Sequence, residues 1–283
     1  MNIGNFHTHT YYCDGTKEPD TYAEEAVKLK LPSLGFSSHA PVSFPCAWTI
    51  PFEKYKHYIE AVSQVKAFYT NQLEIYCGLE IDYIPDLWSE TNRLINLRDV
   101  DYFIGSIHFI DAYKDGIRWG IDGSNEEFRK GLSEIFNNDL QAVIHTYFDY
   151  TRKMVQEMKP SVIGHIDKIK MQHTDHGSMT DDPAFKNELY LTLEEIASSG
   201  CIVEINTRGV YRRQEPEFYP GTWAIREMSR LNIPVILSSD AHRPEELINL
   251  FSMAVDTLRL AGYKSVITRK LNKWIELDIN EIY

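Results

Sequence analysis

Short apolar runs alternate with longer segments of helical periodicity along the chain. Apolar runs of about four to eight residues are typical of buried strands, whereas an apolar residue every three to four positions is typical of an amphipathic helix. The pattern predicts strands at residues 2–6, 33–36, 74–77, 102–107, 161–163, 201–205 and 234–237. It predicts helices at residues 19–30, 53–69, 86–96, 133–158, 182–199, 222–231 and 244–261.

This alternation predicts an α/β fold with a parallel sheet, because a helix usually connects consecutive parallel strands. Closure into a TIM-like barrel is the expected outcome, and an open doubly wound sheet is the alternative. At 283 residues the chain has the size of one such barrel, and no repeat, low-complexity tract or Pro/Gly/Ser-rich linker divides it. We therefore expect residues 1–283 to form a single domain.

Histidine and acidic residues recur directly after the predicted strands. His7 and His9 follow the first apolar run, and Asp14 comes shortly after them. The later strands lead into His39, Glu80, His108, His165, Asp240 and His242. Because the carboxyl ends of the strands in a parallel barrel lie on one face, we expect all nine residues to converge there. His7 and His9 are two positions apart on an extended segment, so both rings can reach one ion.

The residue types in this pattern indicate a catalytic site with several metal ions. Neutral imidazole and carboxylate groups are ligands for zinc, iron and manganese, and six of the ten histidines follow strands in this way. The cysteines show no paired spacing, so we expect neither disulfides nor a cysteine-based zinc site. They are Cys13, Cys46, Cys77 and Cys201.

The other four histidines are expected outside the metal site. His57 falls on a predicted surface helix, and His173 and His176 fall in a polar loop, so these three should face solvent. His145 lies in an aromatic-rich helix, where packing is the favoured interpretation and a place in the substrate pocket is the alternative.

The net charge of −12 disfavours a nucleic-acid partner, because no stripe of Lys and Arg offsets the repulsion of a phosphate backbone. Small substrates fit this charge better. No run approaches the roughly 20 apolar residues of a membrane span, and the N-terminal residues do not resemble a signal peptide. We expect a cytoplasmic protein without a membrane partner, and nothing in the pattern predicts its oligomeric state.

Six short motifs together resemble the polymerase and histidinol phosphatase (PHP) superfamily across nearly the full chain. They are HTHT at 7–10, SSHAP at 37–41, GLEIDY at 78–83, GSIHF at 105–109, GHID at 164–167 and SSDAH at 238–242. Within that superfamily the chain is similar to the histidinol-phosphate phosphatases in its length and in the residues that follow GSIHF and the strand at 201–205. The resemblance implies a distorted (βα)7 barrel and up to three divalent metals, which could be zinc, manganese or iron.

The resemblance also implies how the nine residues divide among the metals. One metal would be held by His7, His9, Glu80 and Asp240, a second by Glu80, His108 and His165, and a third by Asp14, His39 and His242. Glu80 would bridge the first two metals, and Glu80, Asp240 and His242 are the predicted catalytic residues. Asp14 departs from the pattern, because some members have a histidine there, and a carboxylate is a harder ligand.

The implied reaction is hydrolysis of histidinol phosphate in histidine biosynthesis, with a hydroxide shared by two metals as the nucleophile. Cationic side chains near the strand ends would neutralise the phosphate, and the candidates are Lys170, Arg208, Arg212 and Arg213. The proton for the leaving group would come from a metal-bound water or from Asp240. Candidates for contacts to the ammonium and imidazole of the substrate are Asp122, Trp119, Tyr147 and Glu215.

Three other functions compete with this one. The first is a PHP phosphoesterase that acts on nucleotides, nucleic-acid ends or other small phosphate esters, which the net charge disfavours for nucleic acid. The second is a metal-binding protein without catalysis, which is disfavoured because all nine ligand positions are filled. The third is a barrel amidohydrolase, which is disfavoured because Glu80 supplies the bridge and no lysine stands at a strand end to do so.

Overall fold

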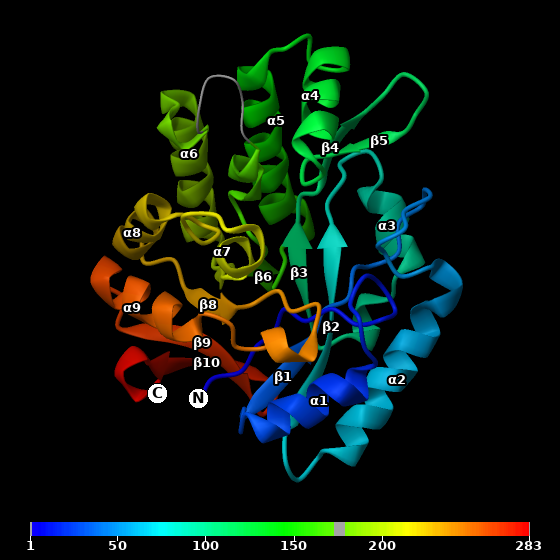
Figure 1. Ribbon diagram of the computed structural model, residues 1–283, viewed down its shortest axis with the longest axis vertical. Helices are drawn as coiled ribbons and strands as arrows, with labels where there is room; N and C mark the ends of the chain where they lie inside the picture. Colours follow the sequence, from blue (N-terminus) through cyan, green and yellow to red (C-terminus); the bar gives the residue numbers. More distant parts are fainter. Residues whose placement is uncertain (1, 173–178, 283) are drawn as a thin grey trace.

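Parallel strands form the centre of the protein, for which a computed structural model describes residues 2–172 and 179–282 (Figure 1). The order in the main sheet is β1-β2-β3-β6-β7-β8-β9-β10, and every neighbouring pair is parallel except β9 with β10. The strands are β1 Ser33–Phe36, β2 Glu74–Asp82, β3 Tyr102–Ser106, β6 Val162–Ile163, β7 Ile202–Asn206, β8 Val235–Ser238, β9 Ser265–Lys270 and β10 Lys273–Asp278. A separate antiparallel hairpin pairs β4 Phe109–Ala112 with β5 Arg118–Gly120.

Helices flank these strands in Figure 1, and the apolar residues of the longer helices are buried in the main hydrophobic core. They are α1 Pro19–Lys28, α2 Tyr55–Phe68, α3 Trp88–Leu94, α4 Asn125–Glu134, α5 Leu140–Lys153, α6 Pro183–Ser199, α7 Arg208–Arg213, α8 Thr222–Arg230 and α9 Phe251–Ala261. The α/β class and the parallel order of the central strands are therefore confirmed.

The predicted strand at 2–6 is replaced by an extended segment with two isolated bridges. Asn5 pairs with Leu34 in β1, and Thr8 pairs with Ala241 after β8. The segment divides its backbone hydrogen bonds between these two neighbours, so it forms a regular ladder with neither: Asn5 O accepts from Gly35 N, whereas His9 N donates to Ala241 O. The regular ladder continues from β8 into β9 and does not return to β1, so the distorted barrel is not closed by a continuous sheet, and only the two isolated bridges of this segment link β1 with the residues after β8.

Two predicted helices are interrupted. The helix predicted at 133–158 is two helices, because Asn137 and Asn138 between α4 and α5 have φ values of 51° and 64°, outside the helical region. The helix predicted at 244–261 begins as a 3-10 turn at Pro244–Glu246, and α9 starts only after Leu250, whose φ is 60°. The hairpins β4–β5 and β9–β10 lie in segments where no strand was predicted.

The β9–β10 hairpin covers the amino ends of the parallel strands. Arg269 in β9 lies 5.0 Å from the ring centroid of Tyr76, 5.9 Å from that of Tyr102 and 4.9 Å from that of Trp274, and Arg269 is buried. These rings belong to one apolar cluster that also contains Phe6, Val162 and Ile202. This end of the sheet is therefore filled by side chains, and the carboxyl ends are left for the functional site.

Candidate metal centre

The nine predicted ligands lie together at the carboxyl ends of the parallel strands. Most of them are buried, whereas the side chain of Asp14 is 33% exposed and that of His242 is 14% exposed. All of them except His165 fall into three groups, and within each group the donor atoms lie within 4.8 Å of one another. His165 belongs to none of these groups and contacts Glu80 instead. The groups are His9, Asp14, His39 and His242; His7, His9 and Asp240; and His39, Glu80 and His108.

Glu80 at the end of β2 connects the groups. Its Oε2 lies 3.1 Å from His7 Nε2 and 3.4 Å from His9 Nε2. Its Oε1 lies 3.0 Å from His165 Nε2 and 3.8 Å from His108 Nε2. His39 Nδ1 also lies 3.1 Å from Oε2, so one carboxylate oxygen faces His7, His9 and His39 and the other faces His108 and His165.

Asp240 completes the group around His7 and His9. Its Oδ1 lies 3.2 Å from His9 Nε2 and 3.7 Å from His7 Nε2, and its Oδ2 accepts a hydrogen bond from Asn206 Nδ2 at 3.2 Å. The φ of Asp240 is 51°, a left-handed conformation that few non-glycine residues adopt. Such a conformation just after β8 turns the carboxylate toward the histidines, and residues in strained conformations often lie at functional sites.

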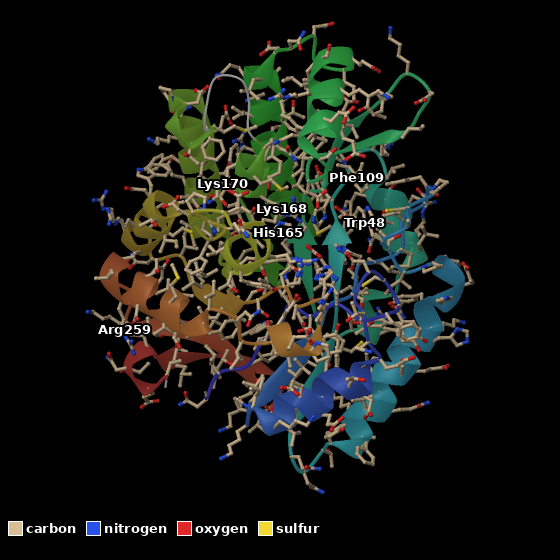
Figure 2. All side chains as sticks on the ribbon, in the orientation of Figure 1. Trp48, Phe109, His165, Lys168, Lys170 and Arg259 are labelled. Carbon is tan, nitrogen blue, oxygen red and sulfur yellow. The ribbon has the colours of Figure 1, made fainter. Side chains whose placement is uncertain are left out.

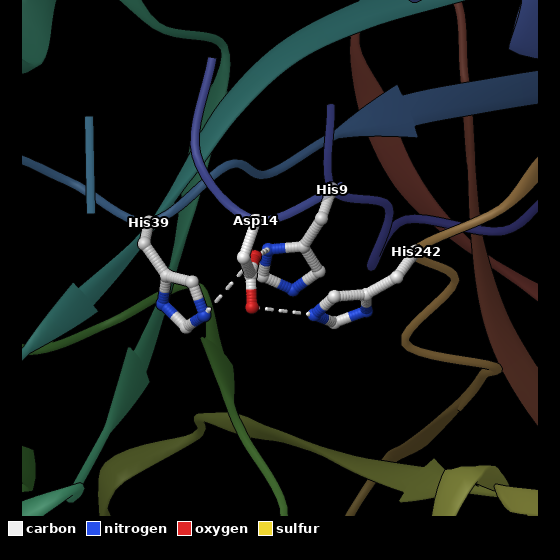
Figure 3. Close-up of side chains that lie close together, drawn as sticks. All are labelled: His9, Asp14, His39 and His242. Atoms are coloured by element: carbon white, nitrogen blue, oxygen red, sulfur yellow. Dashed lines mark hydrogen bonds and ion pairs between the residues drawn. The ribbon is translucent and has the colours of Figure 1, made fainter. Parts of the chain in front are cut away.

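The most exposed group surrounds Asp14, and Figure 3 shows it in close-up. Its Oδ2 lies 3.0 Å from His242 Nε2, and its Oδ1 lies 3.5 Å from His9 Nδ1 and 3.9 Å from His39 Nε2. The rings of His9 and His242 stack with their centroids 4.1 Å apart. One carboxylate and three imidazoles thus surround a single small volume.

This donor set fits divalent cations. The ring atoms His7 Nε2, His9 Nε2 and His39 Nδ1 are buried and have no hydrogen-bond partner. Burying a polar atom without a partner costs free energy, and a metal ion removes this cost by accepting the lone pair. Imidazole and carboxylate donors that converge in this way bind zinc, manganese or iron.

Two acidic residues that were not predicted as functional orient the ligands. Glu204 in β7 lies 2.7 Å from His7 Nδ1, and Asp82 in β2 lies 2.8 Å from His108 Nδ1. With Nδ1 occupied, each ring presents Nε2 toward Glu80, which is the usual role of carboxylates behind metal-binding histidines. The available signal was an acidic residue within an apolar strand, because Asp82 ends β2 and Glu204 is the middle residue of β7, and both are buried.

Burial and mutual charges set the protonation of these residues. Burial lowers the pKa of His9 to about 4 and the pKa of His39 to about 3, so both are neutral near pH 7. Burial raises the pKa of Glu80, but His7 and His39 lower that pKa by more, and the carboxyl stays ionised. Burial lowers the pKa of His108, but Asp82 raises it to about 9, so a cation at this ring must displace a proton.

The ligands open into a cavity of about 310 Å³ that three cationic side chains also line, Lys168, Arg208 and Arg213. Lys168 Nζ lies 3.0 Å from Asp122 Oδ2 and 3.1 Å from His108 Nε2. Burial lowers the pKa of Lys168, but Asp122, Asp240 and Glu80 raise it above its usual value, so the amine stays charged. The cavity therefore places positive charge directly beside the candidate metal ligands.

Some of the predicted phosphate contacts line this cavity and others do not. Arg208 and Arg213 line it, whereas Arg212 is exposed elsewhere on α7. Lys170 is buried outside the lining, where its Nζ donates to Asp167 Oδ2 at 2.8 Å and to Phe218 O at 2.6 Å. Lys168 was not predicted, although it lies two residues before Lys170 in the same 3-10 turn.

Among the expected contacts to the leaving group, Asp122 lines the cavity. Trp119 does not, because it is packed under α4 against Phe128 and Phe136. Tyr147 is buried with its hydroxyl 3.5 Å from His165 O, and Glu215 is outside the lining. The aromatic side chains that do line the cavity are Trp48 and Tyr219, which were not predicted.

Two further expectations have clear outcomes. His57 is exposed, as predicted. His145 is neither packed nor in the cavity, because its side chain is 63% exposed and pairs with Glu188 at 2.9 Å, so that prediction is wrong.

His173 and His176 lie outside the described residues, and the four cysteines are free thiols. Within residues 2–172 and 179–282, no helix is long and apolar enough to cross a membrane.

Comparisons with known proteins agree with this geometry. The family model of the PHP domain matches residues 5–208. A Deinococcus radiodurans protein named a probable histidinol-phosphatase is 29% identical over 93% of this chain and 95% of its own length, and the histidinol-phosphatase of Bacillus subtilis is 28% identical over 84% and 92%. The structure of histidinol phosphate phosphatase from Lactococcus lactis, complexed with zinc, L-histidinol and phosphate, superposes with a TM-score of 0.72 at 20% identity, over 97% of this chain and 99% of that one.

The contact between Asp82 and His108 yields a test of metal binding. We expect Asp82→Asn to weaken metal affinity by roughly 10-fold to 100-fold, because a neutral amide accepts the hydrogen bond from Nδ1 more weakly than a carboxylate and holds the ring less firmly with Nε2 toward Glu80. Competition with a coloured chelator, followed by metal analysis, measures this change. The matched control is Asp256→Asn on α9, whose side chain is 70% exposed, and it should retain wild-type affinity. Equal affinity in both variants would show that Asp82 does not orient a ligand.

Proposed function

Because the chain belongs to the PHP domain family, we propose that it is a metal-dependent histidinol-phosphate phosphatase. It would convert L-histidinol phosphate and water to L-histidinol and phosphate. The observation that carries this proposal is the cavity in which the metal-binding residues face Lys168, Arg208 and Arg213. Metal donors and cations that line one cavity suit a phosphate dianion, whose charge both can neutralise.

We assign three metal positions from the contacts of Glu80 and Asp14. The first would lie among His7, His9, Glu80 and Asp240, and the second among Glu80, His108 and His165. The third would lie among Asp14, His39 and His242, with zinc, manganese or iron as the candidate ions. Divalent cations there would polarise the phosphoryl oxygens and lower the pKa of a bound water.

The chain's own residues would position the phosphate and its charge. Arg208 is held in place because its Nη1 donates to Asp240 O at 3.0 Å and lies 3.3 Å from Glu246 Oε2. It would neutralise phosphate oxygens together with Lys168 and Arg213 as charge moves in the transition state. Burial raises the pKa of Asp240, but His7, His9 and Arg208 hold that pKa well below its usual value. Asp240 would therefore act as an ionised acceptor and not as a ready proton donor.

One domain would contain the whole site. The PHP match ends at residue 208, yet Asp240 and His242 lie beyond it and contact His9 from the first segment. We propose on this basis that residues 1–283 form a single domain. A phosphatase that acts on nucleotides or other small phosphate esters is the alternative, because the same donors would bind any phosphomonoester.

Phosphate release from a panel of monoesters tests the proposed function. With manganese or zinc added, we expect histidinol phosphate to be hydrolysed with a kcat/KM at least about 100-fold above those of glycerol phosphate and a nucleoside monophosphate. Removing metal with a chelator should abolish release, and adding metal back should restore it. A preference for the nucleotide would favour the alternative, and equal slow rates on all substrates would contradict a dedicated histidinol-phosphate phosphatase.

Two neighbouring arginines on α7 give a matched pair of variants. Arg208 lines the cavity and Arg212 does not, although they lie on the same short helix. We expect Arg208→Met to lower kcat/KM by about 10²-fold to 10³-fold, the size of effect seen when a preorganised charge contact is removed. Arg212→Met should remain within about twofold of wild type. Equal losses in the two variants would contradict a phosphate contact for Arg208.

A further inference from the structure

One side of the cavity is aromatic, and Trp48 forms it. The indole belongs to the loop that follows β1 and is partly exposed where it lines the cavity. Figure 2 shows Trp48 and Phe109 on one side of the strand ends and Lys168 and His165 on the other. A molecule bound between them would meet cations at one end and an aromatic surface at the other.

Contacts with neighbouring rings fix the position of this indole. Trp48 stacks on Phe109 with centroids 5.4 Å apart and an interplanar angle of 10°, and Phe44 packs edge-on against Phe109 at 5.1 Å. The centroids of His39 and His108 lie 4.5 and 5.4 Å from that of Trp48. Phe109 is 7% exposed, so the aromatic surface that the stack leaves open is that of Trp48.

The loop that carries Trp48 is also tied to the metal-binding strand end. Ile50 N donates to His39 O at 3.0 Å, two residues after Trp48. The indole therefore keeps a set distance from His39, and through it from the group of donors around Asp14. A phosphate held at the metal centre would bring the carbon side of its ester toward this fixed ring.

We propose that Trp48 determines specificity by packing against the ring of the leaving group, a planar imidazole in the proposed reaction. This inference rests on the proposed function and assigns a residue to its selectivity. Aromatic faces attract planar rings by stacking and cations by their quadrupole, and an imidazole offers a planar ring and, when protonated, a positive charge. Asp122 also lines the cavity, but its carboxylate is paired with Lys168 at 3.0 Å, so the selectivity is assigned to Trp48 alone.

The test compares two substrates in two variants of Trp48 and one control. Trp48→Leu keeps apolar bulk without an aromatic face, and Trp48→Phe keeps a smaller face. We expect Trp48→Leu to raise KM for histidinol phosphate by about 10-fold and to change KM for glycerol phosphate by less than twofold. Trp48→Phe should remain within about threefold on both substrates. Trp223→Ala on α8, a partly exposed tryptophan outside the cavity, should match wild type.

Inhibition constants and metal content separate binding from structural damage. In Trp48→Leu the inhibition constant of L-histidinol should rise about 10-fold, whereas that of inorganic phosphate and the metal content should not change. Equal losses on both substrates, or an unchanged KM for histidinol phosphate, would overturn the assignment of Trp48. If wild-type protein does not prefer histidinol phosphate, the proposed function itself fails, whereas a wild-type preference that survives in Trp48→Leu contradicts only this inference.

Discussion

The buried carboxylate of Glu80 is the group on which the rest of the site depends. It is 1% exposed, and an ionised carboxylate is costly to remove from water unless charges and hydrogen bonds compensate it. Here the compensation comes from imidazoles on several strands, and Ser106 Oγ donates to Oε1 at 2.6 Å. His7 faces one oxygen of Glu80 and His165 faces the other. The ionised form of this buried carboxylate is therefore stable only while these neighbours are in place. Divalent cations supply positive charge where these donors converge.

Side chains fill the amino end of the parallel sheet, which leaves the carboxyl end for the polar groups that surround Glu80. The hairpin β9–β10 and the aromatic cluster around Arg269 occupy the amino ends of the strands. The ligands can then gather at the carboxyl ends without breaking the apolar core. The extended segment that carries His7 and His9 is bridged on both sides, to β1 and to Ala241, which brings the first two ligands between Glu80 and Asp240.

The convergence of the nine candidate ligands was predictable, because each follows an apolar run and parallel strands bring such positions to one face. Features that depend on local geometry were not predictable in this way. Lys168 and Lys170 differ only in which side of one 3-10 turn they occupy, and Lys168 alone lines the cavity. Trp48 lies in a loop without periodicity, and the left-handed residues Asn137 and Asn138 interrupt an otherwise helical pattern. Closure of the sheet depended on pairing between distant segments, which periodicity does not specify.

The most direct test of the account is the position of bound metal relative to Glu80. Crystals of the protein loaded with manganese or zinc would be measured at wavelengths on both sides of the metal absorption edge. Among up to three anomalous peaks, the account predicts that two lie about 3.5–4 Å apart beside Glu80, with one carboxylate oxygen of Glu80 ligating each of these two ions. A single ion at this position, or two ions with Glu80 bound to neither, would contradict the central role assigned to this carboxylate.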